Sequence, residues 1–374
     1  MQEEFEAGWG SIVGDLLRCI VDKTSIRDRI RMSAVCRFWQ NSLKDEKINF
    51  PICLMLSEKE SSDKRSFNSN AEEVIIELDL PEIRGRRCWG TPFGWLVTFG
   101  LDLEIRLFNP LSKASLSLPS LRSFDNDFDY PPEDLRLYFI KKVFLSSSPT
   151  SPDCIAMAIC GVSNRDETLV FAKPGDQVWT QICFIFSMDD ITCFNGNFFV
   201  VLITGEVLIC EDLNGPSPKL VEFAAPPSTV HLGHKKYIVD LGGDLCMITR
   251  GVGRYDIRYD SGRVERTDLT EEFEIFKLDM HTKNWEKILS LGEHSLFLGN
   301  CCTFSVLAAN YPRCRANCIY FTDDNFYYYP QARVSDIGIY NCDNTKDINY
   351  INDYEVLDLR STFSPPLWIK LGSH

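Results

Sequence analysis

Residues 276–285 read Phe276-Lys-Leu-Asp-Met-His-Thr-Lys-Asn-Trp, and their pattern is the clearest indication of the fold. A large apolar residue stands at each end, and the residues between them include Asp and Asn, which favour tight turns. The pattern predicts two short antiparallel strands joined by a hairpin. The same layout, with its second apolar residue eight or nine positions after the first, recurs at residues 108–116, 171–179 and 339–348. The repetition predicts a fold assembled from one hairpin-based unit.

The spacing of these hairpins indicates which repeat architecture they build. Residues 209–220 and 74–80 are two weaker copies, so the hairpins recur at roughly 40 to 65 residues. Four-stranded sheets repeated around an axis, as in a kelch-type β-propeller, have this period. We therefore expect an all-β propeller of about six blades, with Trp179 and Trp285 in blade cores. Two polar stretches, residues 57–73 and 146–153, are predicted to be long loops.

The first fifty residues have a different pattern. Val13, Leu16, Leu17 and Ile20 follow i, i+3, i+4 and i+7, which is one stripe of a helix. A second predicted helix, from about residue 28, carries two apolar stripes, and a unit of this size has too little interior to bury both. One stripe is free to meet another chain, or both pack against the propeller.

The N-terminal residues resemble an F-box. The order Trp9, Ile12-Val13, Asp15-Leu16-Leu17, Ile20 and then Val35-Cys36-Arg37-Phe38-Trp39 is similar to the F-box pattern of Leu-Pro, Leu-Leu and Val-Cys-x-x-Trp. The resemblance implies a small all-α module that docks on a Skp-type adaptor and, through it, on a cullin. It assigns the adaptor surface to eight residues: Ile12, Val13, Leu16, Leu17, Ile20, Val35, Cys36 and Trp39.

The rest of the chain resembles plant F-box proteins of the KIB type. The resemblance rests on Leu80-Pro-Glu-Ile-Arg-Gly-Arg-Arg-Cys-Trp-Gly, Gly94-Trp-Leu-Val-Thr, Asn317-Cys-Ile-Tyr-Phe-Thr-Asp-Asp and Ser364-Pro-Pro-Leu-Trp-Ile. It implies a multidomain protein with an F-box at residues 1–50 and a propeller-like recognition domain at residues 51–374. The expected function is that of a substrate receptor in a Skp–cullin–F-box ubiquitin ligase. The alternative is a non-ligase binding protein whose propeller sequesters a partner while a degenerate F-box is idle.

Charge argues against a nucleic-acid partner. The chain has 39 basic and 53 acidic residues, for a net charge of −14, and residues 1–50 are balanced, so the whole excess lies in the propeller. Such a domain repels phosphate backbones. A basic cluster at Arg84, Arg86 and Arg87 is interpreted as a solvated loop.

The sequence indicates a chain that acts in the cytoplasm or nucleus. The longest apolar run, residues 198–203, is far shorter than the roughly 20 residues of a membrane-spanning helix. The N-terminus is acidic, unlike a signal peptide. The fifteen cysteines are interpreted as reduced, small apolar residues, and their spacing predicts no metal site. No cofactor is expected.

Catalysis has no candidate residues in familiar motifs. The sequence contains no Gly-x-Ser-x-Gly elbow, phosphate-binding glycine loop or His-Glu-x-x-His. Asp323 and Asp324 are adjacent carboxylates that would point to opposite faces of a strand, and we interpret them as a turn. The chain is therefore expected to be an adaptor without a catalytic site.

Two segments combine aromatic and acidic or polar residues in a way that suits a protein partner. Residues 123–134 contain three aromatic residues and five carboxylates, and residues 325–330 contain four consecutive aromatic residues. Aromatic anchors beside charge are typical of interaction hot spots. Phe124, Phe128, Tyr328 and Tyr329 are the predicted substrate-binding residues. The competing interpretation is a strand at residues 326–329 with alternate rings buried.

One departure from the F-box pattern gives a first prediction. Val13 stands where F-boxes have proline, whose ring pre-sets φ for the first helical turn. Val13→Pro should therefore leave adaptor affinity equal or higher, as measured by titration with a purified Skp adaptor. A clear loss of affinity in a folded variant would show that Val13 does not occupy the F-box proline position.

Overall fold

The structure is a computed structural model that describes residues 14–21, 24, 28, 32, 51–59, 61–69, 74–124, 130–162, 167–184, 187–258, 262, 264–299, 301–324, 336–343, 348–350, 361 and 363–372. These residues include one helix of the N-terminal segment, α1 (Gly14–Val21), and a large β domain. Within them, no helix is long and apolar enough to cross a membrane.

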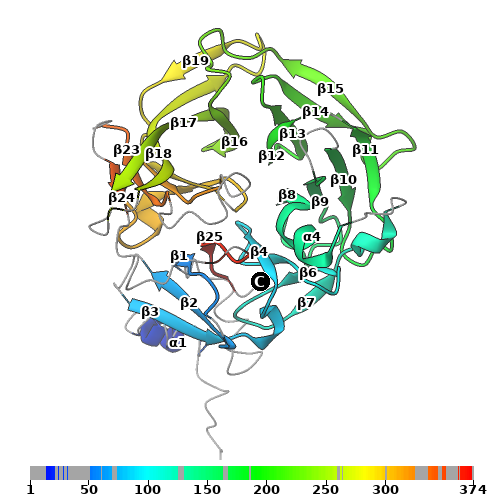
Figure 1. Ribbon diagram of the computed structural model, residues 1–374, viewed down its shortest axis with the longest axis vertical. Helices are drawn as coiled ribbons and strands as arrows, with labels where there is room; N and C mark the ends of the chain where they lie inside the picture. Colours follow the sequence, from blue (N-terminus) through cyan, green and yellow to red (C-terminus); the bar gives the residue numbers. More distant parts are fainter. Residues whose placement is uncertain are drawn as a thin grey trace, which may run out of the picture.

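Six β-sheets stand around a common axis, which makes the large domain a six-bladed propeller (Figure 1). Blade 1 consists of β25 (Leu367–Lys370), β1 (Ile52–Met55), β2 (Lys64–Ser69) and β3 (Val74–Asp79). Blade 2 consists of β4 (Arg87–Gly90), β5 (Leu96–Phe99), β6 (Ile105–Phe108) and β7 (Ser115–Ser117). Blade 3 consists of β8 (Ile140–Leu145), β9 (Ala156–Cys160), β10 (Thr168–Ala172) and β11 (Thr180–Phe184).

The second half of the ring completes the circle. Blade 4 consists of β12 (Met188–Phe194), β13 (Asn197–Leu202), β14 (Val207–Glu211) and β15 (Lys219–Ala224). Blade 5 consists of β16 (Lys235–Leu241), β17 (Asp244–Arg258), β18 (Val264–Leu278) and β19 (Trp285–Ile288). Blade 6 has five strands: β20 (His294–Leu298), β21 (Phe304–Leu307), β22 (Cys318–Phe321), β23 (Gly338–Asn341) and β24 (Ile348–Tyr350). The predicted six-bladed propeller is confirmed.

Each blade is buried on both faces, which explains the apolar sequence of its inner strands. Successive side chains on a strand point to opposite sides. On β13, Phe198 and Val200 pack with blade 3, whereas Phe199 and Val201 pack with blade 5. Six apolar clusters of this kind fill the six gaps between neighbouring blades. The run at residues 198–203 is therefore a central strand.

The ring is closed by the two ends of the β domain. The C-terminal strand β25 pairs with β1 in antiparallel register, from Ile52 opposite Lys370 to Met55 opposite Leu367. Trp368 is fully buried between blades 1 and 6, with its ring centroid 5.4 Å from Phe297 and 5.6 Å from Tyr320. This pairing protects the inner strand edge that an open ring would expose.

The hairpins that predicted the fold are the outer pairs of blades. Residues 108–116, 171–179, 276–285 and 339–348 connect the two outermost strands of blades 2, 3, 5 and 6. Trp179 and Trp285 occupy equivalent places, because each indole N–H donates to a carbonyl of the connection from the preceding blade, at 2.9 Å to Pro119 and 2.7 Å to Ala225. Trp179 is buried, and Trp285 is half-buried against a core cluster.

One loop prediction is confirmed and the other is wrong. No strand lies within residues 146–153, but the stretch at residues 57–73 contains β2. Phe67 of β2 is buried, and Arg65 is buried because Glu58 pairs with its guanidinium at 2.8 Å and Ser364 accepts from it at 2.6 Å. A strand rich in polar residues can enter the blade because these partners compensate its charge.

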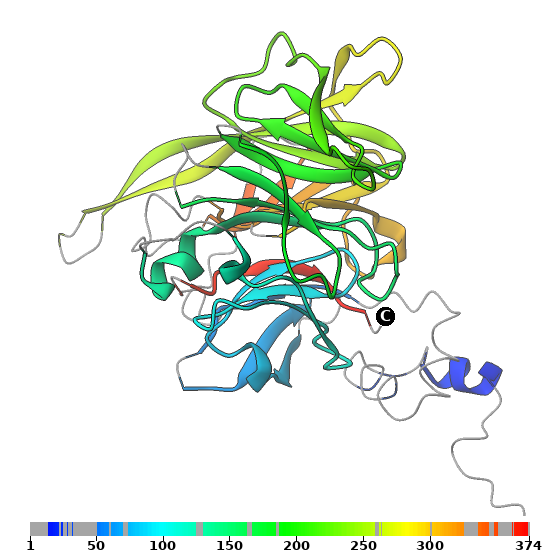
Figure 2. The same cartoon turned by 90° about the vertical axis from the view of Figure 1, so that its right-hand side faces the viewer.

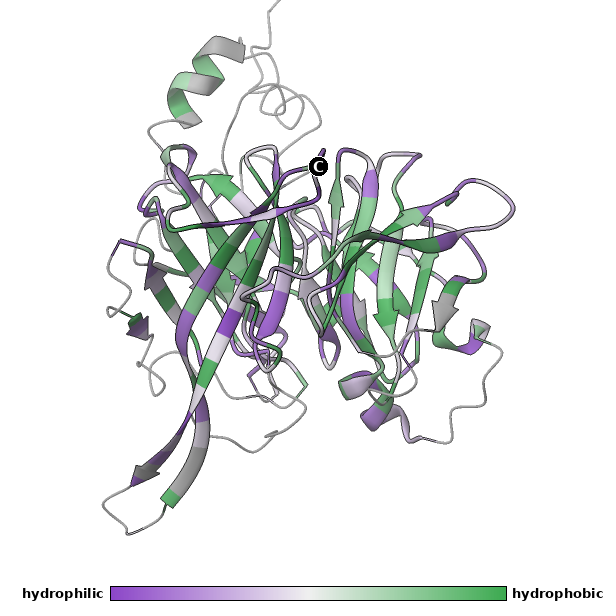
Figure 3. Ribbon diagram, turned by 90° about the horizontal axis from the view of Figure 1, so that it is seen from above, coloured by the Kyte–Doolittle hydropathy of each residue, from purple (hydrophilic) through white to green (hydrophobic). Residues whose placement is uncertain are grey.

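The propeller has two different ends. All inner strands run in one direction, so α4 (Pro132–Tyr138), which precedes β8, lies at the end where inner strands begin. The β17–β18 hairpin extends as a long arm beyond the same end (Figure 3). We call this end the arm face and the other the closure face, where β1 begins and β25 ends. Helix α1 lies beyond the closure face, away from the arm (Figure 2).

Ring closure by β25 predicts a large effect of a single residue. Trp368→Ala should lower the free energy of unfolding by about 3–5 kcal/mol, because a fully buried indole is replaced by a cavity at the blade 1–blade 6 contact. Urea unfolding followed by far-UV circular dichroism measures it. Leu289→Ala, at a position 79% exposed, is the control and should change stability by less than about 0.5 kcal/mol. Equal stabilities of the two variants would contradict this closure.

Candidate partner-binding surfaces

Helix α1 exposes two of the residues assigned to the adaptor surface. Leu16 is 60% exposed and Ile20 is 39% exposed, and their i, i+4 spacing places them on one side of the helix. Leu17 is fully buried within this chain, and its assignment to the adaptor surface stays a prediction. The other five assigned residues, Ile12, Val13, Val35, Cys36 and Trp39, lie outside the described residues.

The two aromatic segments begin and end on the arm face. In the first segment, residues 123–134, Phe124 and Tyr130 precede α4. Asp324 and Asp336, which stand before and after the second segment, residues 325–330, both pair with Arg250 at the base of the arm. Phe124 packs half-buried on Phe139, with ring centroids 5.3 Å apart, which leaves only part of its ring for a partner. Phe128, Tyr328 and Tyr329 lie outside the described residues. Their role in substrate binding stays a prediction.

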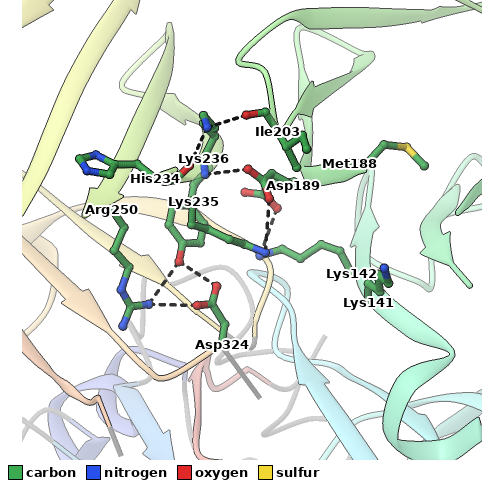
Figure 4. A network of polar contacts seen from close by, with 12 residues as sticks. Lys141, Lys142, Met188, Asp189, Ile203, His234, Lys235, Lys236, Arg250 and Asp324 are labelled. Atoms are coloured by element: carbon green, nitrogen blue, oxygen red, sulfur yellow. Dashed lines mark hydrogen bonds and ion pairs between the residues drawn. The ribbon is translucent and has the colours of Figure 1, made fainter. Parts of the chain in front are cut away.

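Arg250 is the centre of a buried polar network on the arm side of the axis (Figure 4). Its guanidinium pairs with Asp324 at 3.2 Å and with Asp336 at 2.8 Å, and it donates to the Thr322 carbonyl at 2.9 Å. The Tyr237 hydroxyl donates to Asp324 at 2.7 Å. The network therefore fixes both ends of the segment that contains the aromatic residues 326–329.

A second layer lies deeper along the axis. Lys142 of β8 pairs with Asp190 of β12 at 3.1 Å, and the side chains of both are almost completely buried. Asp190 also accepts from the Thr303 hydroxyl at 2.6 Å and from the Ile238 backbone N–H at 3.2 Å. A buried ion pair persists only when such additional hydrogen bonds compensate the loss of hydration.

Thr303 belongs to a piece of blade 6 that crosses the axis. Gly299 and residues 301–303, here the axial segment, join β20 to β21 but contact three other blades. The Cys302 N–H donates to the Gly90 carbonyl at 2.9 Å, its thiol donates to the Val143 carbonyl at 3.0 Å, and Gly299 accepts from Lys142 at 3.3 Å. The Lys142–Asp190 pair thus helps to hold the axial segment in place.

The carboxyl groups of the network have opposite pKa shifts. Burial by itself raises the pKa of Asp324, but Lys235, Arg250 and the hydrogen bond from Tyr237 outweigh it, so the pKa is held below its usual range. Burial dominates at Asp189 and raises its pKa, although Lys235 lies 3.7 Å away. Asp323 and Asp324 follow β22, where a turn was expected, but no local pattern indicates that Asp324 is buried in an ion-pair network.

Beyond the axial segment, on the closure side, lies a pocket of about 390 Å³. Its walls come from the ends of inner strands, at Phe144 of β8, Thr192 of β12 and Val239 of β16, and from the axial segment with β21. Asp240 and His294 stand among the lining residues. No local sequence pattern indicates this pocket, because its residues come from five blades.

The basic cluster predicted to be a solvated loop is largely buried. Arg84 is exposed and pairs with Asp63, but Arg86 and Arg87 are buried. Arg86 pairs with Asp102 at 2.9 Å and donates to the Thr98 hydroxyl at 3.1 Å. The interpretation as a solvated loop is therefore wrong for Arg86 and Arg87, because Arg87 begins β4, Arg86 directly precedes it, and both are buried in the blade. Buried in this way, they form no surface for phosphate groups.

An exposed apolar pair on an N-terminal helix, joined to a closed six-bladed propeller, defines the class of F-box proteins with propeller recognition domains. The F-box domain family matches residues 12–51. The KIB1-4 β-propeller family matches residues 66–341, and the chain belongs to this family. The architecture is typical of adaptor proteins rather than enzymes, and the F-box indicates binding to a Skp1-type adaptor.

The chain is similar over most of its length to F-box proteins of Arabidopsis thaliana. The F-box protein At4g35733 is 30% identical over 373 residues, which cover 93% of this chain and 97% of the relative. The F-box protein At2g26160 is 22% identical over 343 residues, covering 84% and 96%. The F-box/kelch-repeat protein At1g57790 is 22% identical over 305 residues, covering 78% and 76%. These similarities support a substrate-receptor role in general.

The lowered pKa of Asp324 predicts how stability depends on pH. A carboxyl group with a depressed folded-state pKa contributes stability that is present above its unfolded pKa, about 3.9, and is lost as the pH falls through the folded pKa. The Asp324→Asn variant should therefore lose less free energy of unfolding than the parent chain between about pH 5 and about pH 3. Urea titrations at each pH measure the difference. Parallel losses in both proteins would show that Asp324 is not held ionised by Lys235 and Arg250.

Proposed function

We propose that this chain is a substrate receptor of a Skp–cullin–F-box ubiquitin ligase. Its N-terminal segment binds a Skp-type adaptor, which links it to a cullin, and its propeller recruits a protein target for ubiquitination. The observation that carries the proposal is the exposure of Leu16 and Ile20 on α1, within the residues that the F-box family matches. Covering apolar side chains of this size with a partner lowers the free energy, because apolar surface is removed from water.

The positions of α1 and the propeller support separate surfaces for the adaptor and the target. Helix α1 lies beyond the closure face, so an adaptor bound there leaves the arm face open to a target (Figure 2). The closed ring gives the recognition domain a fixed shape, and loops on a rigid scaffold are common binding elements. Phe124, Phe128, Tyr328 and Tyr329 are the proposed arm-face contacts with the target.

The proposed place of action is the cytoplasm or the nucleus. The thirteen cysteines whose side chains the structure describes are all free, and most of them are buried. Burial raises the pKa of several thiols, among them Cys88 to about 11 and Cys246 to about 12, so these groups are unreactive neutral thiols at neutral pH. Free buried thiols fit a reducing compartment.

The adaptor contact is tested by charge substitution on the exposed side of α1. The double variant Leu16→Asp, Ile20→Asp should lower affinity for a purified Skp adaptor at least about a hundredfold, because the interface would bury unpaired carboxylates. Calorimetric titration measures the affinity. Asp324→Asn, in the propeller, is the matched control and should bind like the parent chain. Unchanged adaptor affinity in the folded double variant would remove α1 from the interface.

A further inference from the structure

The arm is a two-stranded ribbon in which the β17 side has an open strand edge. β16 begins at Lys235, opposite Arg250 of β17, so beyond this point β18 is the only described strand that pairs with β17. That pairing continues in unbroken register from Val252 to Arg258 and projects from the arm face (Figure 2, Figure 3). A strand without a neighbour presents unpaired backbone N–H and C=O groups at every second residue.

The side chains of β17 show that this edge lies in solvent. Val252 is 45% exposed and Tyr255 is 43% exposed. Because they are three positions apart on a strand, they point to opposite faces of the ribbon, so both faces beside β17 are open. Arg254 pairs with Asp268 of β18 at 3.2 Å, which directs its charge toward β18 and away from the edge. Residues 252–258 contain no proline, which would interrupt a backbone ladder.

The β18 side of the ribbon is different, because blade 6 covers it. Thr267 and Thr270 are buried. The Thr270 carbonyl accepts from the Tyr350 hydroxyl of β24 at 2.5 Å, and the Thr270 hydroxyl donates to Asp336 at 2.6 Å. A bulge with Glu271 as its extra residue also interrupts the regular pattern of β18 at the base of the arm. A further strand can therefore add only beside β17.

We propose that an extended segment of the protein target adds to the β17 edge as a third strand of the arm. In this mode of recognition, backbone hydrogen bonds give affinity and alternate side chains give specificity. A two-stranded ribbon that projects from its sheet also gains stability from a third strand. The proposal describes how the arm face holds the target of the receptor function proposed above, and it rests on that function.

The chemistry of the ribbon indicates which segment fits. Val252 and Tyr255 are best covered by β-branched or aromatic side chains of an added strand, which pack across neighbouring strands. Residues 252–258 and 264–272 contain three basic and five acidic residues, so the ribbon has a net negative charge. Complementary charge favours lysine or arginine in the target segment. The fitting segment is therefore extended, rich in β-branched residues and basic.

Two peptides with acetylated and amidated ends test the backbone contact. The first is Lys-Thr-Val-Thr-Val-Thr-Val-Thr-Lys. The second has the same sequence with an N-methyl group on every valine and threonine, which keeps the side chains and charges but removes the N–H donors between the lysines. In calorimetric titrations of the full chain bound to its adaptor, the first should bind with a Kd of about 1 mM or below, and the second at least about tenfold more weakly.

Two lysine substitutions on the same ribbon locate the contact. Val252→Lys should weaken binding of the first peptide about tenfold or more, because a lysine on an edge strand opposes strand addition and repels the basic peptide. Val264→Lys adds the same charge on β18, at a position 52% exposed, and is the matched control. It should bind within about twofold of the parent chain.

Four outcomes overturn the proposal: no binding of the first peptide at about 10 mM, equal binding of the two peptides, equal effects of the two lysine substitutions, or a dimer of the parent chain that Val252→Lys dissociates. The last would show that a second copy of this chain occupies the edge. Adaptor affinity is measured in the same preparations. If the adaptor binds and the peptides do not, the edge assignment fails while the receptor function stands; if the parent chain does not bind the adaptor, the receptor function itself fails.

Discussion

The pairing of β25 with β1 is the constraint on which the rest of the structure depends. Blades with apolar residues on both faces cannot stand alone, since each face must be covered by the next blade. The clusters between blades therefore form a closed series. In the last one, between blades 6 and 1, Trp368 of the C-terminal strand packs on Phe297 and Tyr320. Closure also brings the end of β25 beside the start of β1, so the N-terminal segment joins the ring on one defined face.

Closure has an electrostatic consequence along the axis. Inner strands of different blades place Lys142, Asp190 and Arg250 in the interior, where an unpaired charge costs several kcal/mol. Each of these charges finds a partner from another blade or from the axial segment. The arm side of the axis is in this way neutralised within the chain.

Local patterns predicted much of the fold. The hairpins with their apolar ends led to the blades, and Trp179 was placed correctly in a core. The interior polar network could not be predicted, because its partners are far apart in sequence: Arg250 and Asp336 are separated by 86 residues. The only available signal was a charge within an apolar strand, such as Lys142 between Ile140 and Val143. Strand β2 was missed because Arg65 looks like a loop residue until Glu58 and the distant Ser364 are placed beside it. On α1 the helical stripe identified Leu16, Leu17 and Ile20, but which of them is covered depends on packing that periodicity does not report.

The receptor function is tested most directly by capturing the chain from plant cells under native conditions and quantifying the cullin that comes with it. The account predicts that the parent chain retains a Skp adaptor and a cullin in near-equal amounts, and that the Leu16→Asp, Ile20→Asp variant loses both while its propeller remains folded. A parent chain that captures its propeller partners but no cullin would contradict the account and would favour a binding protein that acts outside the ligase.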